Sequence, residues 1–240
     1  NTTSALTTLS LRDSGSLGAA AIGDALQTNT VLTTLDLTGT TDMDQQQSIG
    51  NAGATAVANA LKVNTALATL KICMSSVGET GLTAFEEGLK VNTALTSLDV
   101  SRSYFRNPSV AGVFGSALAS ALTGENTALT SLNLDFSDVG DGNAFGRTLS
   151  EALVVNTALS SLSMYYVDIE PDGAVAIAGS LGTNTVLQTL TMSHANVGNS
   201  GGIAFGEALK KNTALTLLDL SNGNLGDAAC AAIADSLKVN

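Results

Sequence analysis

Hydrophobic residues along this chain recur in two alternating patterns. The first is a short motif, leucine-x-x-leucine-x-leucine or a close variant, which ends in strict alternation of apolar and polar residues. Such alternation is typical of a short strand with one buried face. The motif returns eight times, starting at Leu6, Leu32, Leu67, Leu95, Leu129, Leu159, Leu187 and Leu215. Successive starts are 26, 35, 28, 34, 30, 28 and 28 residues apart, which defines eight units on a basal period of 28 residues.

The second pattern follows the motif within each unit and has helical spacing. Ala54, Val57, Ala58 and Leu61, for example, lie at i, i+3, i+4 and i+7, which predicts a helix with one buried face. The predicted helices end at an asparagine in seven units: Asn29, Asn64, Asn92, Asn126, Asn156, Asn184 and Asn212. Because asparagine tolerates the left-handed backbone conformation that closes a helix, we expect these residues to act as caps in that conformation.

One strand and one helix cannot bury their apolar faces alone, so the units must stack on one another. The pattern predicts a parallel sheet on the inner curve and helices on the outer curve. The chain resembles the ribonuclease-inhibitor-like class of leucine-rich repeats, which is also found in NOD-like receptors. The resemblance implies an α/β leucine-rich-repeat solenoid, a curved horseshoe segment. We expect residues 1–240 to form one such domain without disulfide caps, or one segment of a longer array.

The chain departs from that class at one place in the repeat. Three positions after the last apolar residue of the motif, the class usually carries Asn or Cys. This chain has there Ser75, Ser103, Ser137, Val167, Ala195 and Gly223. We therefore expect the turn that leaves the strand to be held less regularly.

The units differ most in the two positions that follow the last apolar residue, at one edge of the predicted sheet. Extra residues around 41–48 and 104–108 fall in the same strand-to-helix connection. Loops that vary over a repetitive frame are often the binding face, and Tyr and Arg are enriched at interface hot spots. The predicted partner-binding residues are Met74, Arg102, Tyr104, Phe105, Arg106, Phe136, Tyr165, Tyr166 and His194. The alternative is that some of these side chains only pack over the uneven loops.

Charge narrows the class of partner. The chain has 10 Lys and Arg against 21 Asp and Glu, a net charge of -11. Binding of nucleic acid or anionic lipid needs clustered cations, so neither is expected, and an acidic surface favours a basic protein partner. No apolar run approaches the ~20 residues of a membrane span.

Catalytic and metal-binding motifs were sought and not found in the sequence. The single histidine, His194, has no second His or Cys beside it for a zinc site or a nucleophile–base pair. Asp135 is expected about 10 Å from it, two strands away, which is too far for a hydrogen bond. Cys73 and Cys230 lie five units apart, too far for a disulfide, and Cys230 takes the inward helical place that Leu82 has in its own unit. We expect no enzyme, cofactor or metal.

Two functions of different kinds therefore remain. The first is a non-catalytic scaffold that binds a protein along the concave face and the adjoining strand-to-helix rim. The alternative is a structural subunit that stacks head to tail into an extracellular filament, or part of a larger repeat array, because neither end of the chain shows a polar cap. The sequence leaves localisation open between intracellular and extracellular.

Overall fold

The computed structural model describes residues 5–39, 49–74, 76–105, 107–124 and 128–240. Strands and helices alternate throughout these ranges. The strands are β1 (Thr8–Ser10), β2 (Thr34–Leu37), β3 (Thr69–Ile72), β4 (Ser97–Asp99), β5 (Ser131–Asn133), β6 (Ser161–Ser163), β7 (Thr189–Thr191) and β8 (Leu217–Asp219). The helices are α1 (Gly15–Leu26), α2 (Gly50–Leu61), α3 (Glu79–Val91), α4 (Pro108–Thr123), α5 (Gly142–Val155), α6 (Pro171–Leu181), α7 (Gly198–Leu209) and α8 (Asp227–Ser236).

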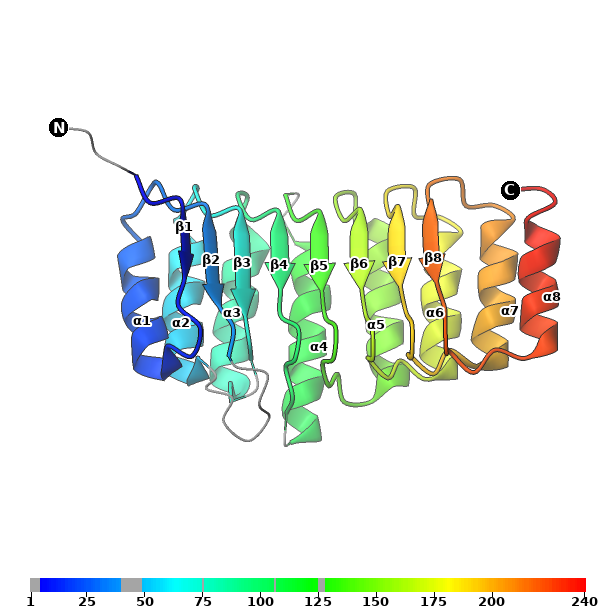
Figure 1. Cartoon of the computed structure of the whole chain (residues 1–240), viewed down its shortest axis with the longest axis horizontal. Coiled ribbons are helices and arrows are strands. Elements are labelled where there is room, and N and C mark those ends of the chain that lie inside the picture. The colour runs from blue at the N-terminus through cyan, green and yellow to red at the C-terminus, as the bar shows by residue number, and fades with distance from the viewer. Residues whose placement is uncertain (1–4, 40–48, 75, 106, 125–127) are drawn as a thin grey trace.

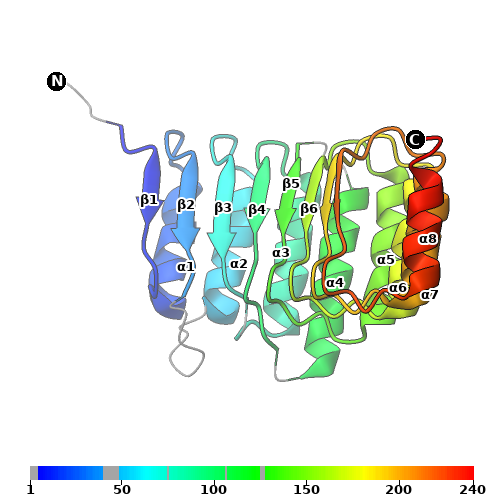
Figure 2. The ribbon, with the colours of Figure 1, turned by 45° about the vertical axis from the view of Figure 1, so that its right-hand side comes forward.

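The strands form one parallel sheet in sequence order, and the helices form a second layer behind it (Figures 1 and 2). The central leucine of each motif pairs with its counterpart in the next unit, as Leu35 does with Leu70. Neighbouring strands are about 4.8 Å apart, whereas packed helices need about 8–10 Å, so the helical side is longer and the sheet lies on the inner curve. The solenoid predicted from the repeat is confirmed.

The core lies between the two layers. Leu70, Leu98, Leu132, Leu162 and Leu190 are all at most 1% exposed. Glycines let adjacent helices approach each other closely: a Cβ at Gly88 would lie 2.6 Å from the carbonyl oxygen of Ala58. Within the described ranges no helix is long and apolar enough to cross a membrane.

Of the asparagines predicted to end the helices, Asn92 and Asn156 directly follow their helices, whereas the other described ones lie three residues beyond the last helical residue. The expected left-handed caps were wrong. Asn92 has φ -74° and ψ 126°, and the other described asparagines of the set also have negative φ. From Asn64 onward, each of these side chains instead links two units. Asn92 Nδ2 donates to the carbonyls of Leu61 (2.7 Å) and Asn64 (3.2 Å) in the preceding unit, and its Oδ1 accepts from the backbone N–H groups of Ala94 and Leu95.

We call this row the Asn ladder; its described members are Asn29, Asn64, Asn92, Asn156, Asn184 and Asn212. Those from Asn64 onward are at most 6% exposed, whereas Asn29 is exposed because no described unit precedes it. Asn126 lies outside the described residues. Because the side chain of each member from Asn64 onward satisfies backbone groups in its own turn and in the preceding unit, the ladder fixes how the units stack.

The two cysteines are both free thiols, and the inward position expected for Cys230 from the sequence was wrong. Cys73 is buried. Cys230 is exposed, although its equivalent Leu82 is fully buried. The reason is position in the stack: α8 is the last helix, and no following unit covers its flank (Figure 2).

Candidate interaction surface

The turn after β1 and the turns after β4 to β8 each place a residue in the left-handed backbone region. In five consecutive units these residues are Arg102, Phe136, Tyr166, His194 and Asn222, with φ between 55° and 60°. Left-handed backbone costs an L-residue roughly 1–2 kcal/mol and is an outlier for a bulky side chain. The backbone N–H of the first four of these residues donates to the next unit, for instance from Phe136 to the carbonyl of Tyr165 at 2.7 Å. The main chain therefore holds the turn and leaves the side chain free to project.

The turns after the strands lie along the rim at the arrowhead ends of the sheet (Figure 1). There the five side chains form a continuous stack, which we call the rim column. The Arg102 guanidinium carbon lies 5.2 Å from the centre of the Phe136 ring. Phe136 stacks on Tyr166 with ring centres 5.3 Å apart, and Tyr166 stacks on His194 at 4.1 Å. Asn222 Nδ2 lies 3.0 Å from His194 Nε2. The sequence predicted that Arg102, Phe136, Tyr166 and His194 share one edge, and the structure brings them into direct contact.

Tyr165 lies beside the rim column on its concave side. Its ring is nearly perpendicular to those of Phe136, Tyr166 and His194, at centre distances of 5.1, 4.8 and 5.6 Å. Offset and edge-to-face ring pairs each contribute about 0.5–1.5 kcal/mol beyond their buried area. The result is a rigid aromatic surface in which Tyr166 remains 48% exposed, while Tyr165, Phe136 and His194 are half-buried.

Asp135 positions Tyr165, a role that the sequence reading missed. In the units of β4, β5 and β8 the last strand residue accepts a hydrogen bond from the N–H two residues on, as Asp99 Oδ1 does from Ser101 at 3.0 Å. Ser163 ends β6 and leaves the N–H of Tyr165 to another acceptor. Asp135 Oδ1, from the preceding unit, accepts from this N–H (2.9 Å) and from Ser163 Oγ (2.6 Å). The available signal in the sequence was Ser163 in place of the Asp or Asn that the units of β4, β5 and β8 have at this position.

Two other predicted residues, Met74 and Phe105, do not join this surface. Met74 is fully buried and Phe105 is 7% exposed, so the packing alternative holds for both. Phe105 contacts Phe114 of α4 with ring centres 5.0 Å apart, because the longer loop folds down over the helix. Tyr104, in the same loop, is half-buried. Arg106 and the 41–48 insertion lie outside the described residues.

The turn also shows how the missing Asn or Cys is replaced. Ser103 Oγ donates to the carbonyl of Val100 at 2.6 Å and accepts from the backbone N–H of Met74 at 3.1 Å. Where Val167 or Ala195 stands, the backbone N–H still donates to the carbonyl three residues back, at 3.3 Å instead of 3.0 Å for Ser137. The turn therefore keeps its shape and is bonded less tightly, as expected.

Two carboxylates of the concave face have lowered pKa values. At Asp219 the hydrogen bonds from the Ser221 side chain and backbone outweigh desolvation and lower the pKa, with a further contribution from His194. At Asp36 burial raises the pKa, but the hydrogen bonds from Thr38 and the charge of Arg12 together lower it below its usual value. Both groups are therefore ionised at neutral pH.

On the described part of this surface, the His194 ring and the Asp135 carboxylate bond to different partners. Among the described residues, no group of His, Cys, Asp and Glu could hold a metal ion. The hydrogen bond found for the His194 ring runs to Asn222, and Asp135 is bonded to Ser163 and the Tyr165 backbone. A base held by an orienting carboxylate needs direct contact between the two, which these bonds do not provide.

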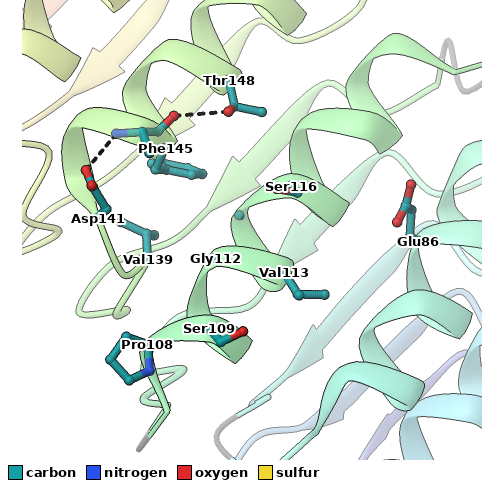
Figure 3. A pocket seen from close by; sticks show the side chains of 12 residues that line it. Glu86, Pro108, Ser109, Gly112, Val113, Ser116, Val139, Asp141, Phe145 and Thr148 are labelled. Carbon is teal, nitrogen blue, oxygen red and sulfur yellow. Dashed lines mark hydrogen bonds between the residues drawn. The ribbon is translucent and has the colours of Figure 1, made fainter.

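A hollow lies on the convex side between α4 and α5 and has a volume of about 560 Å³ (Figure 3). Its lining includes Val113, Val139 and Phe145. Its two carboxylates are already engaged: Asp141 caps α5 by accepting from Ala144 N–H at 2.8 Å, and Glu86 pairs with Lys90 at 2.6 Å. This groove therefore has a packing role and no evident chemistry.

Comparison with known proteins supports the repeat and does not identify a function. Residues 183–206 and 211–234 each match the family model described as Leucine Rich repeat. No curated protein matches the chain in sequence. Among solved structures, the chain is similar to the tropomodulin C-terminal domain from Caenorhabditis elegans (8% identity, TM-score 0.43, covering 75% of this chain and 84% of that one). It is also similar to the actin-binding site 2 of leiomodin-1 (18% identity, TM-score 0.41, covering 78% and 87%). We draw no functional conclusion from likenesses at this level.

Proposed function

We propose that this leucine-rich-repeat protein is a non-catalytic scaffold that binds another protein through its concave face and strand-to-helix rim. The observation that supports this is the rim column. Glycine or asparagine fits a left-handed position without much strain, yet four of the five units carry Arg, Phe, Tyr and His there. Strained, exposed residues that persist in a well-ordered frame favour a functional explanation.

The chemistry of the rim column suits a protein surface. Tyrosine and arginine are enriched at interface hot spots because they combine large apolar area with hydrogen-bonding tips. Here the rings are already held by their neighbours, with Tyr166 between Phe136 and His194. Binding would therefore order few side chains, each of which otherwise costs about 0.5–1.5 kcal/mol.

The test is the double substitution Tyr165→Ala with Tyr166→Ala. A protein captured by the intact chain is purified and titrated calorimetrically against both forms, and we expect the variant to lose at least about 2 kcal/mol of binding free energy. The matched control is Val154→Ala with Val155→Ala, which removes two exposed side chains from the convex helix α5. Equal affinity of the rim variant and the intact chain would overturn the proposal.

Head-to-tail stacking is a second candidate, favoured by the two end faces. At one end an open hollow of about 290 Å³ is lined by Leu215, Leu217 and Leu237, of which the last two are 48% and 68% exposed. At the other, Leu6 and Leu17 are 60% and 86% exposed. A second copy could place its β1 beside β8 and cover both surfaces, a heterologous contact that propagates.

Sedimentation velocity over a range of protein concentrations tests this candidate. The intact chain should form larger species as concentration rises, and Leu217→Glu with Leu237→Glu should stop this without affecting binding at the rim. A concentration-independent monomer would rule the candidate out and leave the scaffold proposal untouched.

A further inference from the structure

The concave surface beside the rim column has a one-sided charge. Three outward-facing positions per unit, two on the strand and one just after it, run across β4 to β8. Among these positions there are three carboxylates, Asp99, Asp135 and Asp219, and no Lys or Arg. Beyond these positions, Lys71 of β3 pairs in register with Asp99, and Arg102 lies on the rim over Phe136. The remaining positions are occupied by Asn133, Leu217, Tyr165 and a set of serines and threonines.

The aromatic stack itself cannot receive a cation on its ring faces. One face of Tyr166 contacts Phe136 and the other contacts His194, while the outer face of Phe136 is covered by Arg102. The stack therefore presents ring edges, which are the positive part of the aromatic quadrupole, together with polar tips. A partner can lie against these edges with apolar groups, and its charged groups must find partners elsewhere.

Apart from Asp135, which holds Tyr165, the carboxylates of this surface are Asp99 and Asp219, and both are half-buried. Asp99 and Asp219 each use Oδ1 to accept from a backbone N–H, of Ser101 at 3.0 Å and of Ser221 at 2.9 Å. Their units are four strands apart, which corresponds to about 19 Å at the usual strand spacing of about 4.8 Å. An extended peptide advances about 3.3 Å per residue, so about six residues span this distance.

We propose that the partner presents an extended basic segment that crosses strands β4 to β8, with cationic side chains at Asp99 and Asp219 and an apolar group against Tyr165. This inference rests on the proposed scaffold function and specifies its partner. Charge complementarity supports it at two levels: the carboxylates of the concave face supply local pairing, and the net charge of -11 steers a basic segment toward the surface.

The test uses synthetic fluorescent peptides that carry two arginines in an otherwise neutral Gly-Ser sequence with one central tyrosine. The spacing between the arginines is set to two, four, six or eight residues, and binding to the full chain is followed by fluorescence anisotropy. We expect the highest affinity near a spacing of six. We also expect at least a tenfold loss of affinity between 50 and 500 mM salt, since exposed charge pairs are screened.

Asp99→Asn with Asp219→Asn is the decisive variant. Asparagine keeps the Oδ1 acceptor for the Ser101 and Ser221 N–H groups, so the charge is removed while the turn is preserved, and Asp135 continues to hold Tyr165. We expect at least a tenfold weaker affinity for the best peptide. Glu151→Gln with Asp172→Asn is the control, because it removes the same net charge from exposed positions on α5 and α6.

Three results would overturn the inference: no binding of any peptide up to 1 mM, equal binding of peptides with glutamate in place of arginine, or equal losses in the two double variants. The last would mean that only the overall charge attracts the peptide. Any of these results would leave the scaffold proposal standing if the Tyr165 and Tyr166 substitutions still abolish binding of the purified partner protein. In that case the partner would be recognised as a neutral or acidic surface.

Discussion

The two rims of the solenoid differ in how much their side chains vary. At the rim where helices lead into strands, the described members of the ladder are all asparagine. At the opposite rim, the rim column consists of Arg, Phe, Tyr, His and Asn in successive units. The Asn ladder is buried and bonds to the backbone of two units. The rim column is exposed or half-buried, and its turn is held by main-chain hydrogen bonds. Where the hydrogen bonds that hold the fold come from a side chain, as in the Asn ladder, the residue type is restricted. Where the backbone provides them, the side chain is available for binding.

Removing one member of the Asn ladder should have the largest effect on stability. Asn92→Ala leaves two carbonyls and two N–H groups without their partner at a site that is 2% exposed. Each unsatisfied buried group costs about 1–3 kcal/mol, and partial rescue by water leaves an expected loss of at least about 3 kcal/mol in the free energy of unfolding. Urea denaturation followed by circular dichroism measures this loss.

Asn29→Ala is the matched control for that experiment. Asn29 has the same role in its turn, accepting from the N–H groups of Val31 and Leu32, but it is exposed and lies at the end of the ladder. Its removal should cost about 1 kcal/mol. Equal losses at the two positions would contradict a ladder that derives its strength from burial between units.

Backbone strain on the variable rim can be relieved at Glu170, with an effect of intermediate size. Glu170 has φ 58° and ψ 159°, a region that is essentially restricted to glycine. Of the equivalent positions, Gly140 and Gly198 also have positive φ, whereas Gly78 and Gly226 have negative φ. Glu170→Gly should raise the free energy of unfolding by about 1 kcal/mol, since the relieved strain exceeds the lost hydrogen bond from Asn143.

Glu170→Ala separates the two contributions in the same denaturation assay. Alanine loses the carboxylate but keeps the Cβ that makes the conformation unfavourable, so this variant should be less stable than the intact chain. If Ala and Gly had the same effect, strain would not explain the difference between this unit and its neighbours.

The sequence predicted the strands and helices of each unit but missed the side-chain contacts between neighbouring units. Alternation and helical spacing are written along the chain, so the strands, helices and buried leucines could be placed, as could the common edge of Phe136 and Tyr166. The Asn ladder and the contact of Asp135 with the unit of Tyr165 depend on the distance across a stack. The burial of Met74 and Phe105 depends on how one loop folds over its neighbour, which no period in the sequence reports.

The smallest expected effect on stability concerns Asp36, whose side chain forms hydrogen bonds within the turn after β2. Its Oδ1 accepts from the Thr38 N–H (3.0 Å) and hydroxyl (2.6 Å), and its Oδ2 faces Arg12 Nε at 3.3 Å. Although burial raises the pKa of Asp36, these interactions lower it overall. A lowered pKa in the folded state means that the charged form stabilises the fold above the unfolded pKa of about 3.9, and that this contribution is lost as the pH falls through the folded value.

Asp36→Asn should therefore be less stable than the intact chain by about 1 kcal/mol or less at pH 7, with a constant difference down to about pH 5. Below about pH 4 the difference should shrink, because the carboxyl group of the intact chain becomes protonated and loses its advantage. Urea denaturation at steps from pH 7 to pH 3 measures the difference, and Asp219→Asn, whose carboxylate also has a lowered pKa, should show the same trend. A difference that grows as the pH falls would mean that burial outweighs the Thr38 and Arg12 interactions at this turn.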